Sequence, residues 1–248
     1  MRVDDVLNLA SMPPGNPSYP RGPYRFIDRE YFIVTYRSDP DAIRAAVPEP
    51  LEPDGSDTVL YEWINMPDSS GFGAYQESGI VIPCRFRGEP VNFTAQMYLN
   101  DEPPITAGRE IWGFPKRWGE ARLSVARDTL TGTLEYGGQR VALGTMGYKH
   151  ESHAMELAER ARHLAKTQVN LKLIPGVDGR PAIAQLVAYN LTDITLKGAW
   201  SGPARLHLVP HVNAPVADFP VRKVLHADHL IADLTLPYGR VLHDYLAR

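Results

Sequence analysis

The sequence contains little that would support a covalent cross-link or a membrane span. Its 248 residues include one cysteine, Cys84, so no intrachain disulfide can form. No apolar run approaches the roughly 18 residues that a membrane-spanning helix requires. The first residues also lack the charged and then apolar layout of a secretory signal. These absences predict a cytoplasmic protein that has no membrane partner.

Charge and short motifs exclude further classes. The formal net charge is −3 and no block of basic residues is present, which argues against a nucleic-acid partner. Neither Gly-x-Gly-x-x-Gly nor a phosphate-binding loop occurs, so we expect no nucleotide cofactor. His226 and His229 resemble a metal-binding pair, but without further ligands nearby we expect no metal site. Gly-x-Ser-x-Gly is also absent, and Cys84 is interpreted as a buried apolar side chain rather than a nucleophile.

Most of the remaining chain is typical of β-strands. Runs of β-branched and aromatic residues are bounded by glycine, proline or aspartate. The expected strands are residues 29–36, 59–65, 80–87, 93–99, 121–128, 132–136, 140–146, 170–174, 183–190, 204–208 and 221–233. Gly137-Gly138 predicts a two-residue hairpin turn. Residues 241–246 fit a closing helix or strand, and the proline-rich residues 11–23 predict an extended, ordered arm.

Two helices are predicted between these strands. The first follows Asp39, a favoured capping residue, and has Pro40 at its first helical position. The second spans residues 152–166, with Ser152 as its cap and one apolar face made by Leu157, Ala161 and Leu164. Many strands and few helices predict a mainly β (α+β) fold. We expect one domain over residues 1–248, an antiparallel sandwich or barrel-like sheet system with a few short helices.

One local feature points to chemistry. Lys116 and Arg117 stand side by side in a segment that also holds Trp112, Phe114 and Trp118. A free lysine has a pKa of about 10.4, so at neutral pH its amine is protonated and cannot attack a carbonyl. Apolar burial and a neighbouring cation both lower that pKa, and a neutral lysine can form a Schiff base with a ketone. The alternative interpretation, a basic surface turn, is the commoner role of Lys-Arg pairs.

A set of motifs along nearly the whole chain resembles the acetoacetate decarboxylase family. The matching stretches, in order and at similar spacing, are residues 20–24, 29–32, 47–51, 77–79, 97–99, 107–110, 145–150 and 199–206. The resemblance implies that Lys116 forms the Schiff base and that the chain is a cofactor-independent decarboxylase of acetoacetate or a close β-keto acid. It also implies a homo-oligomer. An aldolase-dehydratase that uses the same lysine, and a non-catalytic binding barrel, are the alternatives.

The resemblance also assigns the other site residues. The family has a second lysine where this chain has Arg117, so its positive charge is kept with a different shape. For Lys116 we expect burial to lower the pKa more than repulsion from Arg117 does. The resemblance puts Arg29, Glu62 and Glu77 in the pocket.

Each of these residues has a structural alternative. From residue type alone, Arg29 could be a strand-end ion pair. Glu62 could be an outward-facing strand residue, and Glu77 a solvated residue in a turn. Met97 would line an apolar pocket or belong to the core.

Overall fold

The fold consists of two packed β-sheets and a few short helices. The computed structural model describes residues 1–247. Thirteen strands form the larger sheet and four form the smaller sheet in this part of the chain. In chain order the strands are β1 (Tyr24–Arg37), β2 (Leu51–Pro53), β3 (Thr58–Met66), β4 (Asp68–Ser69), β5 (Tyr75–Phe86), β6 (Glu89–Leu99), β7 (Lys116–Trp118), β8 (Glu120–Ala126), β9 (Thr129–Tyr136), β10 (Gln139–Gly147), β11 (Glu151–Ser152), β12 (Gln168–Pro175), β13 (Pro181–Tyr189), β14 (Thr192–Ser201), β15 (Ala204–Leu208), β16 (Lys223–Leu236) and β17 (Arg240–Asp244).

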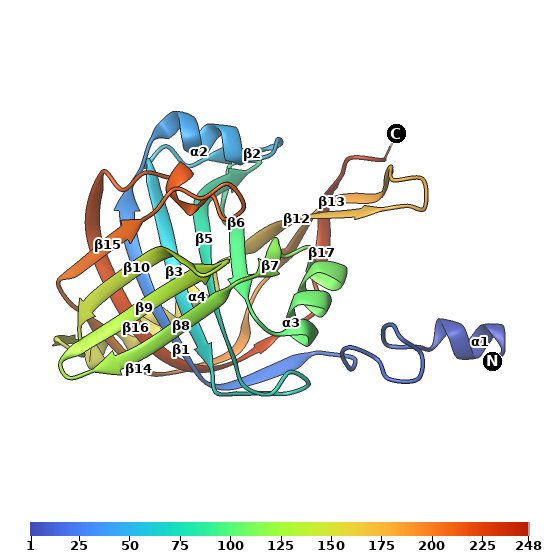
Figure 1. The fold of residues 1–248 in the computed structure, drawn as a ribbon, viewed down its shortest axis with the longest axis horizontal. Helices are drawn as coiled ribbons and strands as arrows, with labels where there is room; N and C mark the ends of the chain where they lie inside the picture. The colour runs from blue at the N-terminus through green and yellow to red at the C-terminus, as the bar shows by residue number, and fades with distance from the viewer. Residues whose placement is uncertain (248) are drawn as a thin grey trace.

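The helices are short and lie between or beside the strands. They are α1 (Val3–Leu7), α2 (Pro40–Ala46), α3 (Glu102–Ala107), a π-helix η1 (Gly108–Trp112), a 3₁₀ turn η2 (Ala154–Glu156), α4 (Leu157–Leu164) and a 3₁₀ turn η3 (Val216–Asp218). Within residues 1–247, no helix combines the length and the apolar character needed to cross a membrane. The N-terminal segment with α1 projects away from the sheets (Figure 1).

The mainly β expectation is confirmed, but the barrel-like expectation holds only in part, because the sheets do not close into a barrel. The larger sheet runs β11-β14-β16-β1-β3-β5-β6-β12-β13-β17, and β2, β4 and β7 pair with its inner strands. β11 and β17 end that order without pairing to each other, so the sheet stays open. The smaller sheet, β15-β10-β9-β8, lies across the long strands (Figure 1). Most pairs are antiparallel, but β6 pairs in parallel with both β7 and β12.

Alternation along the strands separates a core from a cavity. On β1, Phe32 and Val34 are fully buried in the cluster between the two sheets, together with Leu134 of β9. Tyr31 and Ile33 alternate with these residues along β1, so their side chains point to the opposite face. On that face they line a cavity that α4 borders. The same sheet therefore supplies a dry core on one face and a ligand-sized space on the other.

The packing of Trp63 fixes β3 against the smaller sheet. A Cβ atom at Gly132 or Gly144 would come within 2.2 or 2.4 Å of the Trp63 ring, so only glycine leaves room for the indole at these two positions. Trp63 is fully buried, and its ring also stacks against that of Phe32. Residues from β1, β3, β9 and β10 thus meet in one close-packed region.

Several local predictions are confirmed. The Asp39 side chain accepts a hydrogen bond from the Asp41 N–H, and Pro40 begins α2. Gly137 and Gly138 have φ of 57° and 78°, as a tight hairpin turn between β9 and β10 requires. Residues 240–244 form a strand, one of the two expected alternatives.

The start of the second helix was predicted wrongly. Ser152 does not cap a helix, because it belongs to β11 and pairs there with Trp200 of β14. Helix α4 begins only at Leu157, after the 3₁₀ turn η2. Its apolar face is confirmed, since Leu157, Ala161 and Leu164 pack against a buried cluster of the larger sheet. α4 is therefore a short helix laid beside the cavity.

Candidate active site

Lys116 is held in a buried position by a strand and a π-helix. It begins β7, which pairs in parallel with β6 and brings Lys116 beside Met97. Its side chain is 6% exposed. Gly108, at the start of η1, approaches it so closely that a Cβ atom there would lie 2.7 Å from Lys116 Cδ. Gly113 then adopts a φ of 75° that ends the π-helix and returns the chain to the sheet.

Glu77 links the lysine to a second cation. Its Oε2 atom lies 3.2 Å from Lys116 Nζ, and its Oε1 atom lies 3.5 Å from Arg29 Nη2. Glu77 belongs to β5 and is only 3% exposed, so it is not the solvated turn residue that was the alternative. The turn-like composition of the segment misleads because Gly79 lies within the strand, where a Cβ atom would lie 2.7 Å from the Gln96 carbonyl oxygen. Arg29 lies within β1 and lines the cavity, so its ion pair with Glu77 is part of the pocket and not a strand-end ion pair.

The pKa of Lys116 is lowered, and burial is the main cause. The ion pair with Glu77 opposes this change, whereas the Arg29 charge adds to it. Burial therefore outweighs the attraction of the carboxylate, which favours the neutral amine that can attack a ketone. Arg29, which lies on β1 and not beside Lys116 in the sequence, is the cation that acts on Lys116.

Arg117 lies outside this group. Adjacent strand residues point to opposite faces, so its side chain leaves the cavity. Its Nη1 donates to the Asn213 carbonyl oxygen at 2.8 Å, and its Nη2 donates to the Tyr136 hydroxyl at 3.0 Å. Arg117 is exposed and is not among the groups that shift the pKa of Lys116. The sequence neighbour of the lysine is thus not its spatial neighbour.

Glu62 supplies a carboxyl group of a different character. It lies on β3, lines the cavity, and therefore is not the outward-facing residue that was the alternative. Burial raises its pKa to about 7, with Arg29 opposing and Glu77 adding to the rise. Near neutral pH this group can hold a proton and release it. Glu77, by contrast, is bracketed by two cations.

Three tyrosines that the sequence analysis missed complete the inner site. Tyr31, Tyr75 and Tyr189 line the cavity, and burial raises the pKa of Tyr31 to about 12. Within residues 1–247, the Tyr31 hydroxyl and Arg29 Nε have no hydrogen-bond partner. They are donors available to a ligand. Tyr31 could have been found from its place two residues after Arg29, on the same face of β1.

Apolar groups close the inner end. The Lys116 amine lies 5.1 Å from the centre of the Phe114 ring and 5.8 Å from that of Tyr75. Met97 is buried and lines the cavity, so it serves both of the roles considered for it. Such surroundings explain the strong burial effect on the amine.

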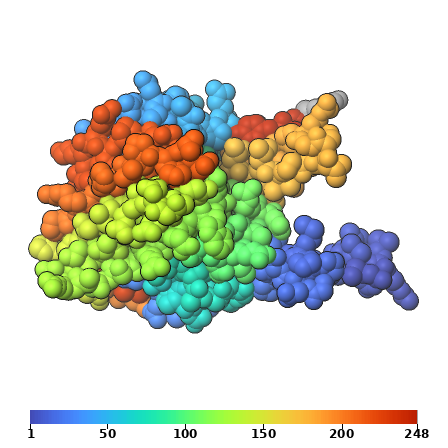
Figure 2. Space-filling view, viewed as in Figure 1, coloured from blue at the N-terminus to red at the C-terminus, as the bar shows by residue number. Residues whose placement is uncertain are grey.

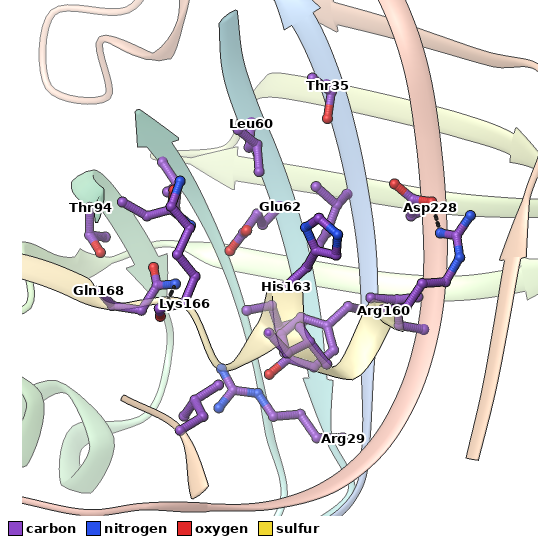
Figure 3. A pocket seen from close by; sticks show the side chains of 18 of the residues that line it. Arg29, Thr35, Leu60, Glu62, Thr94, Arg160, His163, Lys166, Gln168 and Asp228 are labelled. Carbon is purple, nitrogen blue, oxygen red and sulfur yellow. Dashed lines mark hydrogen bonds and ion pairs between the residues drawn. The ribbon is translucent and has the colours of Figure 1, made fainter. Parts of the chain in front are cut away.

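The cavity itself extends well beyond Lys116. Its volume is about 830 Å³. From the inner site it continues past Glu62 to α4 and the start of β12, where Arg160, His163, Lys166 and Gln168 line it (Figure 3). The inner and outer parts share the same face of the larger sheet.

The candidate metal pair does not assemble. His226 and His229 are three residues apart on β16, so they point to opposite faces of the sheet. His229 is buried in the core layer, with its Nε2 2.8 Å from Glu30 Oε1, whereas His226 lies at the cavity rim. No group of three or more His, Cys, Asp or Glu side chains suited to a metal ion occurs in residues 1–247.

The chain is similar over its length to acetoacetate decarboxylases. The sequence model described as "Acetoacetate decarboxylase (ADC)" matches residues 9–246. An acetoacetate decarboxylase of Bordetella avium is 55% identical over 249 residues, covering 100% of both chains. A solved acetoacetate decarboxylase superposes with a TM-score of 0.96 at 44% identity, covering 100% of both chains. Another, from Legionella pneumophila, gives 0.93 at 46% identity, covering 100% of this chain and 98% of the other.

Proposed function

Because this chain belongs to the acetoacetate decarboxylase family, we infer that it is a carboxy-lyase that converts acetoacetate into acetone and carbon dioxide. The observation that supports a Schiff-base route is the buried Lys116, whose amine has a lowered pKa in spite of its ion pair with Glu77. A lysine in this state is the nucleophile that such a decarboxylation needs.

In the proposed mechanism the Lys116 amine attacks the ketone carbon of acetoacetate and water leaves, which forms a protonated imine. The bond between the α-carbon and the carboxylate then breaks, and its electron pair moves toward the imine nitrogen as carbon dioxide departs. Arg29 and the Tyr31 hydroxyl are donors that could orient the substrate carboxylate. The apolar surroundings favour a transition state in which that charge is dispersed.

The enamine that remains must be protonated at its α-carbon. We assign this proton to Glu62, whose raised pKa makes it an acid near neutral pH. Hydrolysis of the resulting imine releases acetone and regenerates the Lys116 amine. Glu77 keeps Lys116 and Arg29 together through both steps.

Borohydride trapping tests this proposal. The protein is incubated with acetoacetate, acetone is assayed, and the imine is reduced and located by peptide mass spectrometry. We expect acetone and an adduct on Lys116 that the Lys116→Met variant loses and the surface control Lys223→Met keeps. A condensation product instead of acetone would indicate the aldolase-dehydratase alternative. An adduct on Lys149, or no adduct, would reject the Schiff base on Lys116.

We also propose that the protein is a homo-oligomer. The hairpin of β12 and β13 and the N-terminal segment both project from the body of the molecule (Figure 2). Large apolar side chains are exposed on both, including Leu173 and Val177 on the hairpin and Val3 and Leu7 on α1. Apolar groups displayed in this way are typical of an interface between subunits. Light scattering on the purified protein in solution should give a mass that is a multiple of the 27.6 kDa of one chain.

Residues 1–248 are proposed to form one domain. In support, β1 near one end of the chain pairs along most of its length with β16 near the other end. Residue 248 itself lies outside the described residues. The cytoplasmic location stays a prediction.

A further inference from the structure

The cavity is far larger than acetoacetate needs. Acetoacetate is a four-carbon acid, whereas sites of roughly 300–1,000 Å³ hold drug-sized ligands. The volume here, about 830 Å³, lies toward the upper end of that range. The reacting group occupies only the inner end, next to Lys116. The rest of the space lies over residues that the proposed mechanism does not use.

The unused space runs along the strands. Met97 stands beside Lys116 in the pairing of β6 with β7, and Thr94, which also lines the cavity, precedes it by three residues on β6. At a rise of about 3.3 Å per residue, Thr94 lies roughly 10 Å from that point. Gln168 pairs with Asn92, still farther along β6. Figure 3 shows Arg29 below Glu62 and Lys166 to the left of Glu62, so the two cations are separated in that view.

The middle of the cavity is apolar. Ile33 of β1, Leu60 of β3, Val81 of β5 and Leu164 of α4 line it. An alkyl chain that continued from the ketone would pass between these side chains. Acetoacetate has no such chain, because only a methyl group follows its ketone.

The far end is polar and carries one available cation. The salt bridges found within residues 1–247 do not include Lys166. Burial lowers the pKa of the Lys166 amine, and the charge of Asp54 opposes this change. Beside it, Thr94, Asn92 and Gln168 line the same end. These groups can donate hydrogen bonds to an anion.

Arg160, the other strong cation at the outer cavity, is already neutralised. Its Nη1 lies 2.7 Å from Asp228 Oδ1 and its Nε lies 3.3 Å from Glu156 Oε2. His163 and Glu159 also line the rim. Lys166 is therefore the cation most suited to an incoming carboxylate.

We propose that the far end of the cavity is a subsite for a second carboxylate, and that the substrates include β-keto acids whose apolar chain ends in a carboxylate group. This inference rests on the proposed function. The reaction stays the same: the bond between the α-carbon and its carboxylate breaks, carbon dioxide leaves and the α-carbon gains a proton. The terminal carboxylate is unchanged in the ketone product, and Lys166 serves only to bind it.

The test compares substrates that differ only at the far end. We would measure kcat/KM for β-ketodecanedioate, β-ketodecanoate and acetoacetate, the chain length being chosen for a span of about 10 Å. Lys166→Met and the charge-keeping Lys166→Arg are the variants, and exposed Lys223→Met is the matched control. We expect the diacid to exceed the monoacid about tenfold, equivalent to about 1.4 kcal/mol. Lys166→Met should remove this preference, and Lys166→Arg and Lys223→Met should keep it.

Two results would overturn the inference. A diacid that is no better than the monoacid would exclude the subsite, and so would a preference that survives in Lys166→Met. The acetoacetate rate separates this failure from a failure of the proposed function. If acetoacetate is decarboxylated, only the subsite is rejected. If neither acetoacetate nor the diacid is decarboxylated, the proposed function fails and the subsite falls with it.

Discussion

The amine of Lys116 lies 3.2 Å from Glu77 Oε2, and both side chains are almost completely buried. An ion pair of this kind would ordinarily stabilise the ammonium form and oppose nucleophilic attack. Burial prevails here, and the second oxygen of Glu77 faces Arg29 at 3.5 Å. The carboxylate is thus shared between two cations, which leaves the lysine amine with a lowered pKa yet a fixed position.

Replacing Glu77 by glutamine should lower the pKa of Lys116 further, because the carboxylate is the group that raises it. The variant should nevertheless lose activity, by about a hundredfold in kcat/KM, since the lysine loses the partner that positions it. The pH dependence of acylation of Lys116 by an amine-reactive probe measures the first effect. An upward shift of the apparent pKa in Glu77→Gln would contradict this account.

Arg29 and Arg117 provide a matched pair of cations. Arg29→Gln should raise the apparent pKa of Lys116, because the Arg29 charge helps to lower it. Arg117→Gln should leave it unchanged, since Arg117 is exposed, bonded to Asn213 and Tyr136, and screened by solvent. The same acylation titration measures both variants. Recovery of an ordinary lysine pKa in Arg117→Gln, with the fold intact, would show that the neighbouring charge dominates after all.

The activity should fall as the pH rises through about 7. Glu62 has its pKa raised to about 7, so it carries a proton below that pH and loses it above. A step that needs this proton is therefore supported on the acid side and lost on the alkaline side. In Glu62→Gln, kcat should drop by about a hundredfold or more, and the fall of kcat on the alkaline side of the pH profile should vanish. A fall that persists in the variant would have to be assigned to another group.

Gly108→Ala should damage the site without unfolding the protein. The backbone at Gly108 is helical, with φ −59° and ψ −47°, so alanine suits it. Its Cβ atom, however, would lie 2.7 Å from Lys116 Cδ and 2.9 Å from Cε. We expect kcat/KM to fall about a hundredfold, at a stability cost of about 1–3 kcal/mol. Gly15→Ala, where no atom lies within 4 Å of the new Cβ, is the control. Full activity in Gly108→Ala would show that the lysine has room to move.

The pair formed by the buried His229 and the half-buried Glu30 should make stability depend on pH. The hydrogen bond from His229 lowers the pKa of Glu30 below its ordinary value. The stabilisation is therefore present above the unfolded-state pKa and lost as the pH falls through the folded-state pKa. Glu30→Gln should reduce the free energy of unfolding by about 1.5–3 kcal/mol at neutral pH, and the difference should shrink in acid. Denaturant titrations at several pH values measure this. The exposed Glu135→Gln should cost no more than about 1 kcal/mol, and an equal cost for both would refute the prediction.

The burial of Lys116 and its lowered pKa were predictable because their signals are local, whereas its catalytic role came from the family resemblance and stays a prediction. A lysine after proline, among aromatic residues, indicates burial wherever the segment ends up in the fold. The capped helix after Asp39 and the Gly137-Gly138 turn were predictable for the same reason, since each depends on a few adjacent residues.

The partners of Lys116 were harder to predict, because they come from distant strands. The local sequence around Glu77 is typical of a turn. Only the pairing of β5 with β3 and β6 shows that Glu77 is buried in a strand. Adjacency in sequence suggested Arg117, yet strand alternation turns it away and brings in Arg29. β14 was not predicted at all, because Asp193 and Gly198 interrupt its pattern and the pairing with β16 has two irregularities.

Glu62, the proposed proton donor, is supported by packing on the opposite face of its strand. Glu62 and Trp63 are consecutive on β3, so the packing of the indole against Gly132 and Gly144 also fixes the backbone that carries the carboxyl group. Those glycines belong to the other sheet and never meet a substrate. A library of variants restricted to the cavity wall would therefore omit Gly132 and Gly144, two positions expected to affect the orientation of the Glu62 carboxyl group. Enlarging either glycine and compensating at Trp63 offers a way to retune catalysis while every residue that touches the substrate is kept.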